Sequence, residues 1–180
     1  MLWRRGYGRV VATLLMLAAT GCGSSLTADI KAESAVDEKV NFSGMKSYAW
    51  YGGLGALIDD TELWSKPGFD MAQECKFVID RELRKKGFSE SSSDPDVFVA
   101  FLLVADVNQI KKIDDERGGN VENLQGVGKG ALLIELIDAE TAKTIWLGGA
   151  TAKVSSKYTD EERKQRLDYA VSELIAQLPK

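Results

Sequence analysis

The chain has 180 residues, of which 44% are apolar, and its 23 basic and 27 acidic residues leave a net charge of −4. This acidic balance argues against a nucleic-acid-binding protein, because recognition of nucleic acid begins with a basic patch. The sequence contains no histidine, which excludes Ser-His and Cys-His nucleophilic sites, imidazole metal ligands and the commonest general base near neutral pH.

The first 21 residues have the pattern of a signal peptide. Three arginines form a basic start, and Val10 to Ala19 is an uncharged, largely apolar run of ten residues. Such a run is too short to span a bilayer as a helix, which needs about 20 residues, but it suits the apolar core of a signal peptide. We therefore expect residues 1–21 to be removed on export.

Cys22 follows this run in the sequence Ala19-Thr20-Gly21-Cys22, which resembles the lipobox of bacterial lipoproteins. The usual lipobox begins with Leu, and here Ala19 stands in its place. We predict cleavage before Cys22 and its lipidation, with two or more acyl chains giving a stable membrane anchor. The alternative is a plain secretory signal cut near Ala19 or Gly21. In Gram-negative lipoproteins an Asp after the Cys favours the inner membrane, so the resemblance implies, through Gly23, the outer membrane, with the protein facing the periplasm.

Removal of residues 1–21 takes away three Arg and no acidic residue, so the remaining 159 residues carry a net charge of −7. A chain of this length suits one domain. Residues 22–36 are small and polar, which predicts a lipidated N-terminus and a flexible tether. Residues 37–180 are expected to form a single α+β periplasmic domain. With Cys22 acylated, Cys75 has no cysteine partner, and its place on an apolar stripe predicts a buried thiol.

The first half of this domain holds a predicted strand, a helix and a second strand. Met45–Trp50 ends in aromatic residues suited to a strand. Asp70–Lys86 repeats apolar residues at spacings of three and four, with Asp70 as the N-cap and Gly87 after the last turn, so we predict a helix. Asp96–Ala105 is nearly all apolar, as a central strand covered on both faces would be.

The second half ends in a hairpin and a helix. Gly130–Asp138 and Lys143–Lys153 have the composition of strands and are separated by a short turn, which predicts an antiparallel hairpin. Thr159 and Glu162 fit a capping box before an apolar stripe that ends at Pro179. The order strand, helix, three strands, helix predicts an α+β fold: a mostly antiparallel four-stranded sheet with two helices packed on one face.

Several short segments, in this order and spacing, resemble the bacterial family called domain of unknown function 4136. They are Asn41 to Trp50, Leu83 with Gly87-Phe88, Pro95-Asp96-Val97, Gly130 to Asp138, and Ile145-Trp146 with Gly148. The resemblance covers roughly residues 37–178. The family consists mostly of envelope lipoproteins, so the resemblance implies that compartment and a fold, and it transfers no catalytic residue. Trp146-Leu147-Gly148 departs from the family's usual Trp-Arg-Gly.

No motif predicts a catalytic, cofactor-binding or metal site. Gly126–Gly130 hints at a phosphate loop but lacks the first Gly and the final hydroxyl residue. The acidic run at 114–116 lacks the spacing of a calcium loop. Asp59-Asp60 and Glu62 suggest a carboxylate pair, but nothing in the sequence sets their separation. We expect an ordinary loop in each place.

Trp50, Trp64 and Trp146 are the tentative ligand residues, since three tryptophans could line an aromatic cleft for a lipid or a glycan. Packing at the ends of core strands is the stronger interpretation, because aromatic side chains dominate core burial.

These observations favour a non-catalytic envelope lipoprotein, held in the outer membrane through acylated Cys22, whose domain binds an unidentified envelope protein or contributes to envelope organisation. The runner-up is a carrier that holds a lipid or a glycan in an aromatic cleft between sheet and helices. An enzyme comes third, because it would need a cleft with converging Asp, Glu, Lys or Tyr side chains.

Overall fold

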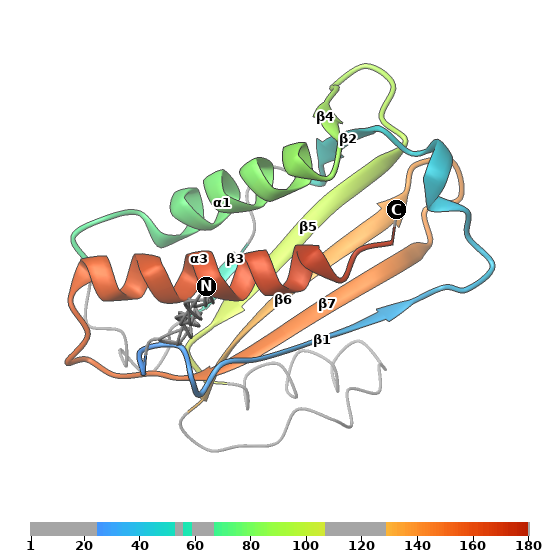
Figure 1. Cartoon of the computed structure of the whole chain (residues 1–180). Helices are drawn as coiled ribbons and strands as arrows, with labels where there is room; N and C mark the ends of the chain where they lie inside the picture. Colours follow the sequence, from blue (N-terminus) through green and yellow to red (C-terminus); the bar gives the residue numbers. More distant parts are fainter. Residues whose placement is uncertain (1–24, 53–55, 59–66, 107–128, 180) are drawn as a thin grey trace, which may run out of the picture.

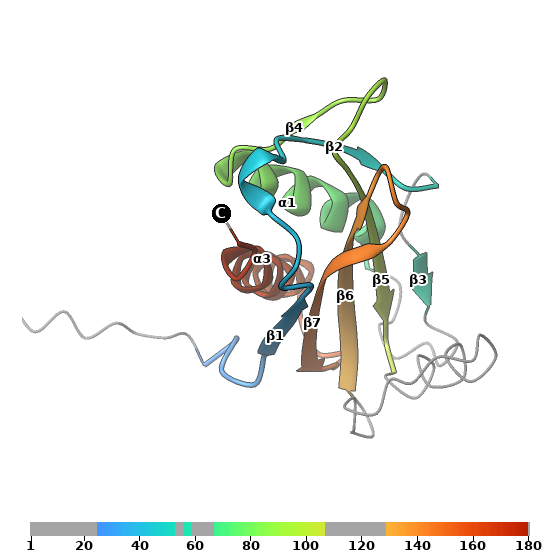
Figure 2. The same ribbon diagram turned by 90° about the vertical axis from the view of Figure 1, so that its right-hand side faces the viewer.

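The computed structural model describes residues 25–52, 56–58, 67–106 and 129–179. In this part of the chain, two long helices lie side by side over one face of one sheet (Figure 1). The view turned by 90° shows the helices as one layer and the strands as the other (Figure 2). Within the described residues, no helix combines the length and the apolar character needed to cross a bilayer.

The described residues contribute seven strands to the sheet, in the order β1-β7-β6-β5-β2-β4, with β3 beside β5 off this path. The bounds are β1 Lys31–Val36, β2 Ser47–Trp50, β3 Ala56–Ile58, β4 Ser89–Glu90, β5 Val97–Val104, β6 Lys129–Asp138 and β7 Thr144–Lys153, and a 3-10 turn, η1, spans Phe42–Gly44. Each neighbouring pair among β1, β7, β6 and β5 is antiparallel. In contrast, β2 and β3 run parallel to β5, and β4 runs parallel to β2. The sheet is therefore mixed.

The predicted four-stranded, mostly antiparallel sheet is wrong in both size and pairing. The missed strands β3 and β4 have three and two residues, which is too short for an alternating apolar pattern. Between β2 and β5 the chain passes through the first long helix. A crossover of this kind brings the second strand back in the direction of the first, so β2 and β5 are parallel neighbours.

The prediction of a flexible tether over residues 22–36 is wrong for residues 31–36. Lys31–Val36 forms β1, which pairs antiparallel with residues 146–151 of β7. All but one of its six side chains are exposed, so the segment lacks the apolar alternation by which a strand is recognised. Charged residues on an edge strand are a common way to protect the end of a sheet. The ordered domain therefore begins before residue 37.

The two helices confirm the predictions made from capping and periodicity. Helix α1 spans Met71–Lys85 and follows the N-cap Asp70, whose side chain accepts two backbone N–H hydrogen bonds. Helix α3 spans Asp160–Ala176 and begins with the predicted capping box of Thr159 and Glu162. Both end near the predicted residues, because these signals depend only on nearby sequence.

The core lies between the helices and the sheet. Along β5, Val99 and Phe101 are buried in this layer, whereas Phe98 and Leu102 on the opposite face are partly exposed. The strand is therefore covered less completely on its second face than predicted, although Val104 on that face is fully buried. The second face keeps apolar side chains, which is why the strand has the composition of a fully buried one.

Trp146 of β7 is the largest of the fully buried side chains, and its ring lies against Gly148. A Cβ atom on Gly148 would lie 2.3 Å from the ring carbon Cη2 of Trp146. The two residues share one face of the strand because their positions differ by two. The glycine therefore leaves the space that the indole ring occupies.

Candidate functional site

The candidate site lies where the chain enters the domain, at the turn before β1. Arg166 of α3 binds this turn: its Nη1 lies 2.8 Å from Oδ1 of Asp29, and its Nη2 lies 2.9 Å from Oδ2. The same guanidinium donates to the carbonyl oxygen of Leu26 and, over 3.1 Å, to that of Lys153. The backbone N–H of Lys153 donates in turn to Asp29 over 2.7 Å. One side chain thus ties the start of the domain to α3 and to the end of β7.

Charge strengthens this arrangement, which we call the N-terminal clamp (Leu26, Asp29, Lys153 and Arg166). The hydrogen bonds that Asp29 accepts from Arg166 lower the pKa of Asp29 from 3.8 to about 2, so its carboxylate is ionised at neutral pH. Arg166 is 7% exposed, and a cation buried to this degree needs a partner. The planar fork of an arginine suits the two-oxygen contact.

An apolar pocket of about 90 Å³ lies beside the clamp, partly open to solvent. It is bounded by α3, by the adjacent ends of β5, β6 and β7, and by the loop that joins β7 to α3. Representative lining residues are Ile30, Leu103, Ala150, Val154, Leu167 and Ala170. Arg166 also lines it, and its guanidinium lies 4.7 Å from the ring centroid of Tyr158, a cation–π distance. The pocket and the clamp therefore share a wall.

A second polar cluster is buried between β2 and α1. The Asp80 side chain accepts hydrogen bonds from the Tyr48 hydroxyl at 2.7 Å, from Trp50 Nε1 at 3.1 Å and from Lys76 Nζ at 2.7 Å. Burial and the bond to Asp80 raise the pKa of Tyr48 above its usual value. Because both Asp80 oxygens are engaged by protein donors, the cluster holds β2 to α1 and presents no evident reactive group.

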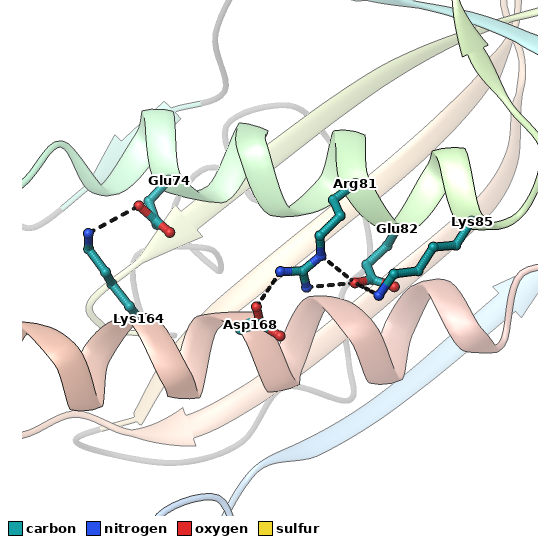
Figure 3. Close-up of polar contacts among 6 residues, drawn as sticks. All are labelled: Glu74, Arg81, Glu82, Lys85, Lys164 and Asp168. Carbon is teal, nitrogen blue, oxygen red and sulfur yellow. Dashed lines mark hydrogen bonds and ion pairs between the residues drawn. The ribbon is translucent and has the colours of Figure 1, made fainter.

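Ion pairs also cross between the two helices (Figure 3). Arg81 of α1 lies 2.6 Å from Asp168 of α3, and Lys164 of α3 lies 3.5 Å from Glu74 of α1. The side chains of Arg81 and Asp168 are 33% and 43% exposed, and pairs at such exposure contribute little to stability. They link the two parallel helices.

Of the tentative ligand tryptophans, the two that the structure describes, Trp50 and Trp146, do not line the pocket beside the clamp. Trp146 is buried in the core, and none of the described residues accepts a hydrogen bond from its indole N–H. Trp50 is half-buried, bonds Asp80 and packs edge-on against Phe101 at a centroid distance of 5.9 Å. Trp64 lies outside the described residues. The positions of Trp50 and Trp146 agree with core packing.

Other predicted positions also lie outside the described residues. They are Cys22, the acidic residues at 59–62 and 114–116, and the glycine-rich residues 126–128. Cys75 is described: its thiol is free and buried, as predicted, and burial raises its pKa. In the described ranges, no three acidic, cysteine or histidine side chains are placed to hold a metal ion.

The sequence interpretation missed the ion pair of the clamp, formed by Asp29 and Arg166. One signal was present for Arg166, which lies four residues before Ala170 and eight before Leu174 and so shares their buried stripe. A basic residue on an apolar stripe requires a partner. Nothing in the small polar segment that contains Asp29 identifies it as that partner, because the two are 137 residues apart.

Comparison with known proteins finds one family match and several solved structures that are similar to this chain. Residues 32–180 match the family model DUF4136, described as a domain of unknown function. A solved structure of a DUF4136 family protein from Bacteroides thetaiotaomicron is 12% identical, with a TM-score of 0.60, over 83% of this chain and 95% of that one. A PelC dodecamer from Paraburkholderia phytofirmans is 10% identical, with a TM-score of 0.48, over 84% and 99%. None of the curated proteins matches. At 12% identity, the Bacteroides structure shows only a shared fold. The PelC structure has a TM-score of 0.48, which is too low to support an inference about this chain.

Proposed function

The chain belongs to the DUF4136 family, and from that premise we propose that it is a non-catalytic envelope lipoprotein, anchored to the outer membrane through acylated Cys22. In this proposal the periplasmic domain serves as a binding or structural module for another envelope protein. The resemblance to the family seen in the sequence motifs is confirmed by the match over residues 32–180. The lipobox-like sequence that ends in Cys22 supports the anchor.

The N-terminal clamp is the observation that carries the proposal furthest. Arg166 holds the carbonyl of Leu26, which is only four residues after Cys22. Four residues span at most about 14 Å when fully extended. A lipid on Cys22 would therefore keep the clamped end of the domain within that distance of the membrane surface, in place of the long flexible tether that the sequence predicted.

This short link would also orient the domain. The clamp and the end of β7 lie at one end of the sheet, and β2 and β4 lie at the other (Figure 1). With the clamped end beside the membrane, the end formed by β2 and β4 points into the periplasm. A periplasmic partner would meet that end first, whereas a partner embedded in the membrane would meet the clamp.

Metabolic labelling with radioactive palmitate tests the anchor. We expect label on the wild-type full chain and none on Cys22→Ala, because the acyl chains are attached to that residue. Cys75→Ala is the matched control, since the Cys75 thiol is buried and free in the folded domain. Equal labelling of the wild type and Cys22→Ala would contradict the lipoprotein proposal.

A second candidate function, a carrier of a small ligand, gains support from the pocket beside the clamp. Of the two ligand classes considered for a carrier, the pocket favours the lipid over the glycan, because its lining is largely aliphatic. Trp50 and Trp146 have no part in this version of the proposal.

A further inference from the structure

We propose that the apolar pocket beside Arg166 takes the end of one alkyl chain, supplied by the protein's own lipid anchor or by a neighbouring phospholipid. The proposal rests on the proposed lipidation of Cys22, which brings alkyl chains to this end of the domain. The shared ligand chemistry is a saturated or singly unsaturated hydrocarbon chain. Three features of the pocket carry the inference: its lining, its size and its position.

The lining suits a hydrocarbon and offers little to a polar ligand. Ile30, Leu103, Leu167 and Ala170 contribute aliphatic surface from three segments of the chain: the turn before β1, β5 and α3. Both arginines in the wall are already paired, Arg166 with Asp29 and Arg163 with Asp160. An alkyl chain would therefore enter without separating either charge pair.

The size of the pocket selects the end of a chain and excludes larger groups. An apolar cavity of about 150 Å³ holds one benzene ring. By that comparison, the volume of about 90 Å³ has room for about three or four carbon atoms. A sugar ring or a phospholipid headgroup does not fit, whereas the end of an acyl chain does, with the rest of the chain passing out through the open side.

The position of the pocket brings it within reach of both sources. Arg166 lines the pocket and also holds Leu26. The four residues from Leu26 back to Cys22 span at most about 14 Å, which is shorter than a fully extended acyl chain of a typical membrane lipid. The anchor's own chain can therefore reach back to the pocket, and the same distance brings the pocket to the phospholipids around the anchor.

Photo-crosslinking in intact cells tests this site. Cells that make the full chain are grown with a fatty acid that carries a diazirine near its methyl end, which enters phospholipids and lipoprotein anchors alike. After irradiation, the protein is purified and its tryptic peptides are mapped by mass spectrometry. We expect crosslinks on the peptide Leu167–Lys180, which contains the lining residues Leu167 and Ala170.

Two matched variants on α3 control for the site. Ala170→Leu fills the pocket and is expected to cause a several-fold loss of crosslinking on this peptide. Ala176→Leu makes the same change at an exposed position of the same helix and the same peptide, and should leave the yield unchanged. If Ala170→Leu fails to fold, Ala152→Leu fills the pocket from β7. Equal yields in the wild type and a folded pocket-filling variant would overturn the proposal, as would crosslinks confined to other peptides.

The crosslinked species distinguishes the two sources. A link between the peptide Leu167–Lys180 and the peptide that begins at Cys22 identifies the protein's own anchor, whereas an added phospholipid mass identifies a neighbouring lipid. The mass of the Cys22 peptide reports acylation independently. An unmodified Cys22 peptide would therefore contradict the lipoprotein proposal, while an acylated one with no crosslink on Leu167–Lys180 would contradict the pocket alone.

Discussion

Asp29 and Arg166 are 137 residues apart in the sequence, yet their side chains meet in a two-oxygen ion pair with N···O distances of 2.8 and 2.9 Å. The pair joins the turn before the first strand to the last helix. Under the proposal that Cys22 is lipidated, the pair would also limit how far the domain can move from that lipid, because the clamped residue Leu26 is only four residues after Cys22.

Removal of the Asp29 carboxylate should destabilise the domain. Asp29→Ala leaves the Arg166 cation without its charged partner at 7% exposure, and we expect a loss of about 1.5–3 kcal/mol in the free energy of unfolding, the range for hydrogen bonds to charged groups. Urea unfolding measures it. Glu33→Ala, at an exposed position of β1, is the control and should stay within about 0.5 kcal/mol of the wild type. A similarly small change for Asp29→Ala would show that the clamp does not hold the turn.

The same pair predicts a pH dependence. The pKa of Asp29 is lowered in the folded protein, so its contribution is fully present above the ordinary value of 3.8 and is lost as the pH falls towards about 2. This contribution is about 2 kcal/mol. Asp29→Asn removes it, so the difference in unfolding free energy between the wild type and Asp29→Asn should be constant above pH 3.8 and shrink below it. A difference that stays constant down to about pH 2 would argue against the shift.

Loss of one hydrogen-bond donor to the buried Asp80 carboxylate should measurably lower the free energy of unfolding. Tyr48→Phe removes the hydroxyl that donates to Asp80 over 2.7 Å and leaves Lys76 and Trp50 as donors. We expect a loss of about 1–2 kcal/mol, because a buried acceptor then has an unfilled position. Tyr51→Phe is the matched control, since Tyr51 is 59% exposed. Equal urea unfolding midpoints for Tyr48→Phe and Tyr51→Phe would show that the hydrogen bond from Tyr48 to Asp80 does not stabilise the domain.

The contact between Trp146 and Gly148 predicts a difference between two neighbouring glycines. Gly148→Ala places a methyl group 2.3 Å from the buried indole ring, whereas the nearest atom to the corresponding methyl in Gly149→Ala lies at 3.4 Å. Overpacking of this kind costs about 1–3 kcal/mol, so Gly148→Ala should melt at a clearly lower temperature than Gly149→Ala. The near-ultraviolet circular dichroism of Trp146 should change in the first variant alone.

Features that depend on nearby residues could be predicted from the sequence. The N-cap Asp70, the capping box at the start of α3 and the hairpin of β6 and β7 all appear where the sequence placed them. Each reflects short-range rules, in which a side chain caps its own helix or a turn joins adjacent strands. The buried Cys75 followed from helical periodicity for the same reason.

Features that depend on residues far apart in the chain could not be predicted from the sequence. Strand β1 is recognised by its pairing with β7 and not by its exposed side chains. Ser47 lies close to Asp96 because β2 and β5 pair in parallel, 49 residues apart. Exposed edge strands and parallel crossovers leave no local apolar pattern that specifies them.

The sequence by itself determined the helices, the hairpin and the family resemblance, and it contains a lipobox-like sequence that ends in Cys22. Only the tertiary structure decided that the domain begins at the turn containing Asp29, and that an apolar pocket adjoins the Arg166 side chain bound there. The physical reason is distance along the chain. Capping and periodicity act over a few residues, whereas an ion pair and a pocket require side chains that only the folded sheet and helices bring together.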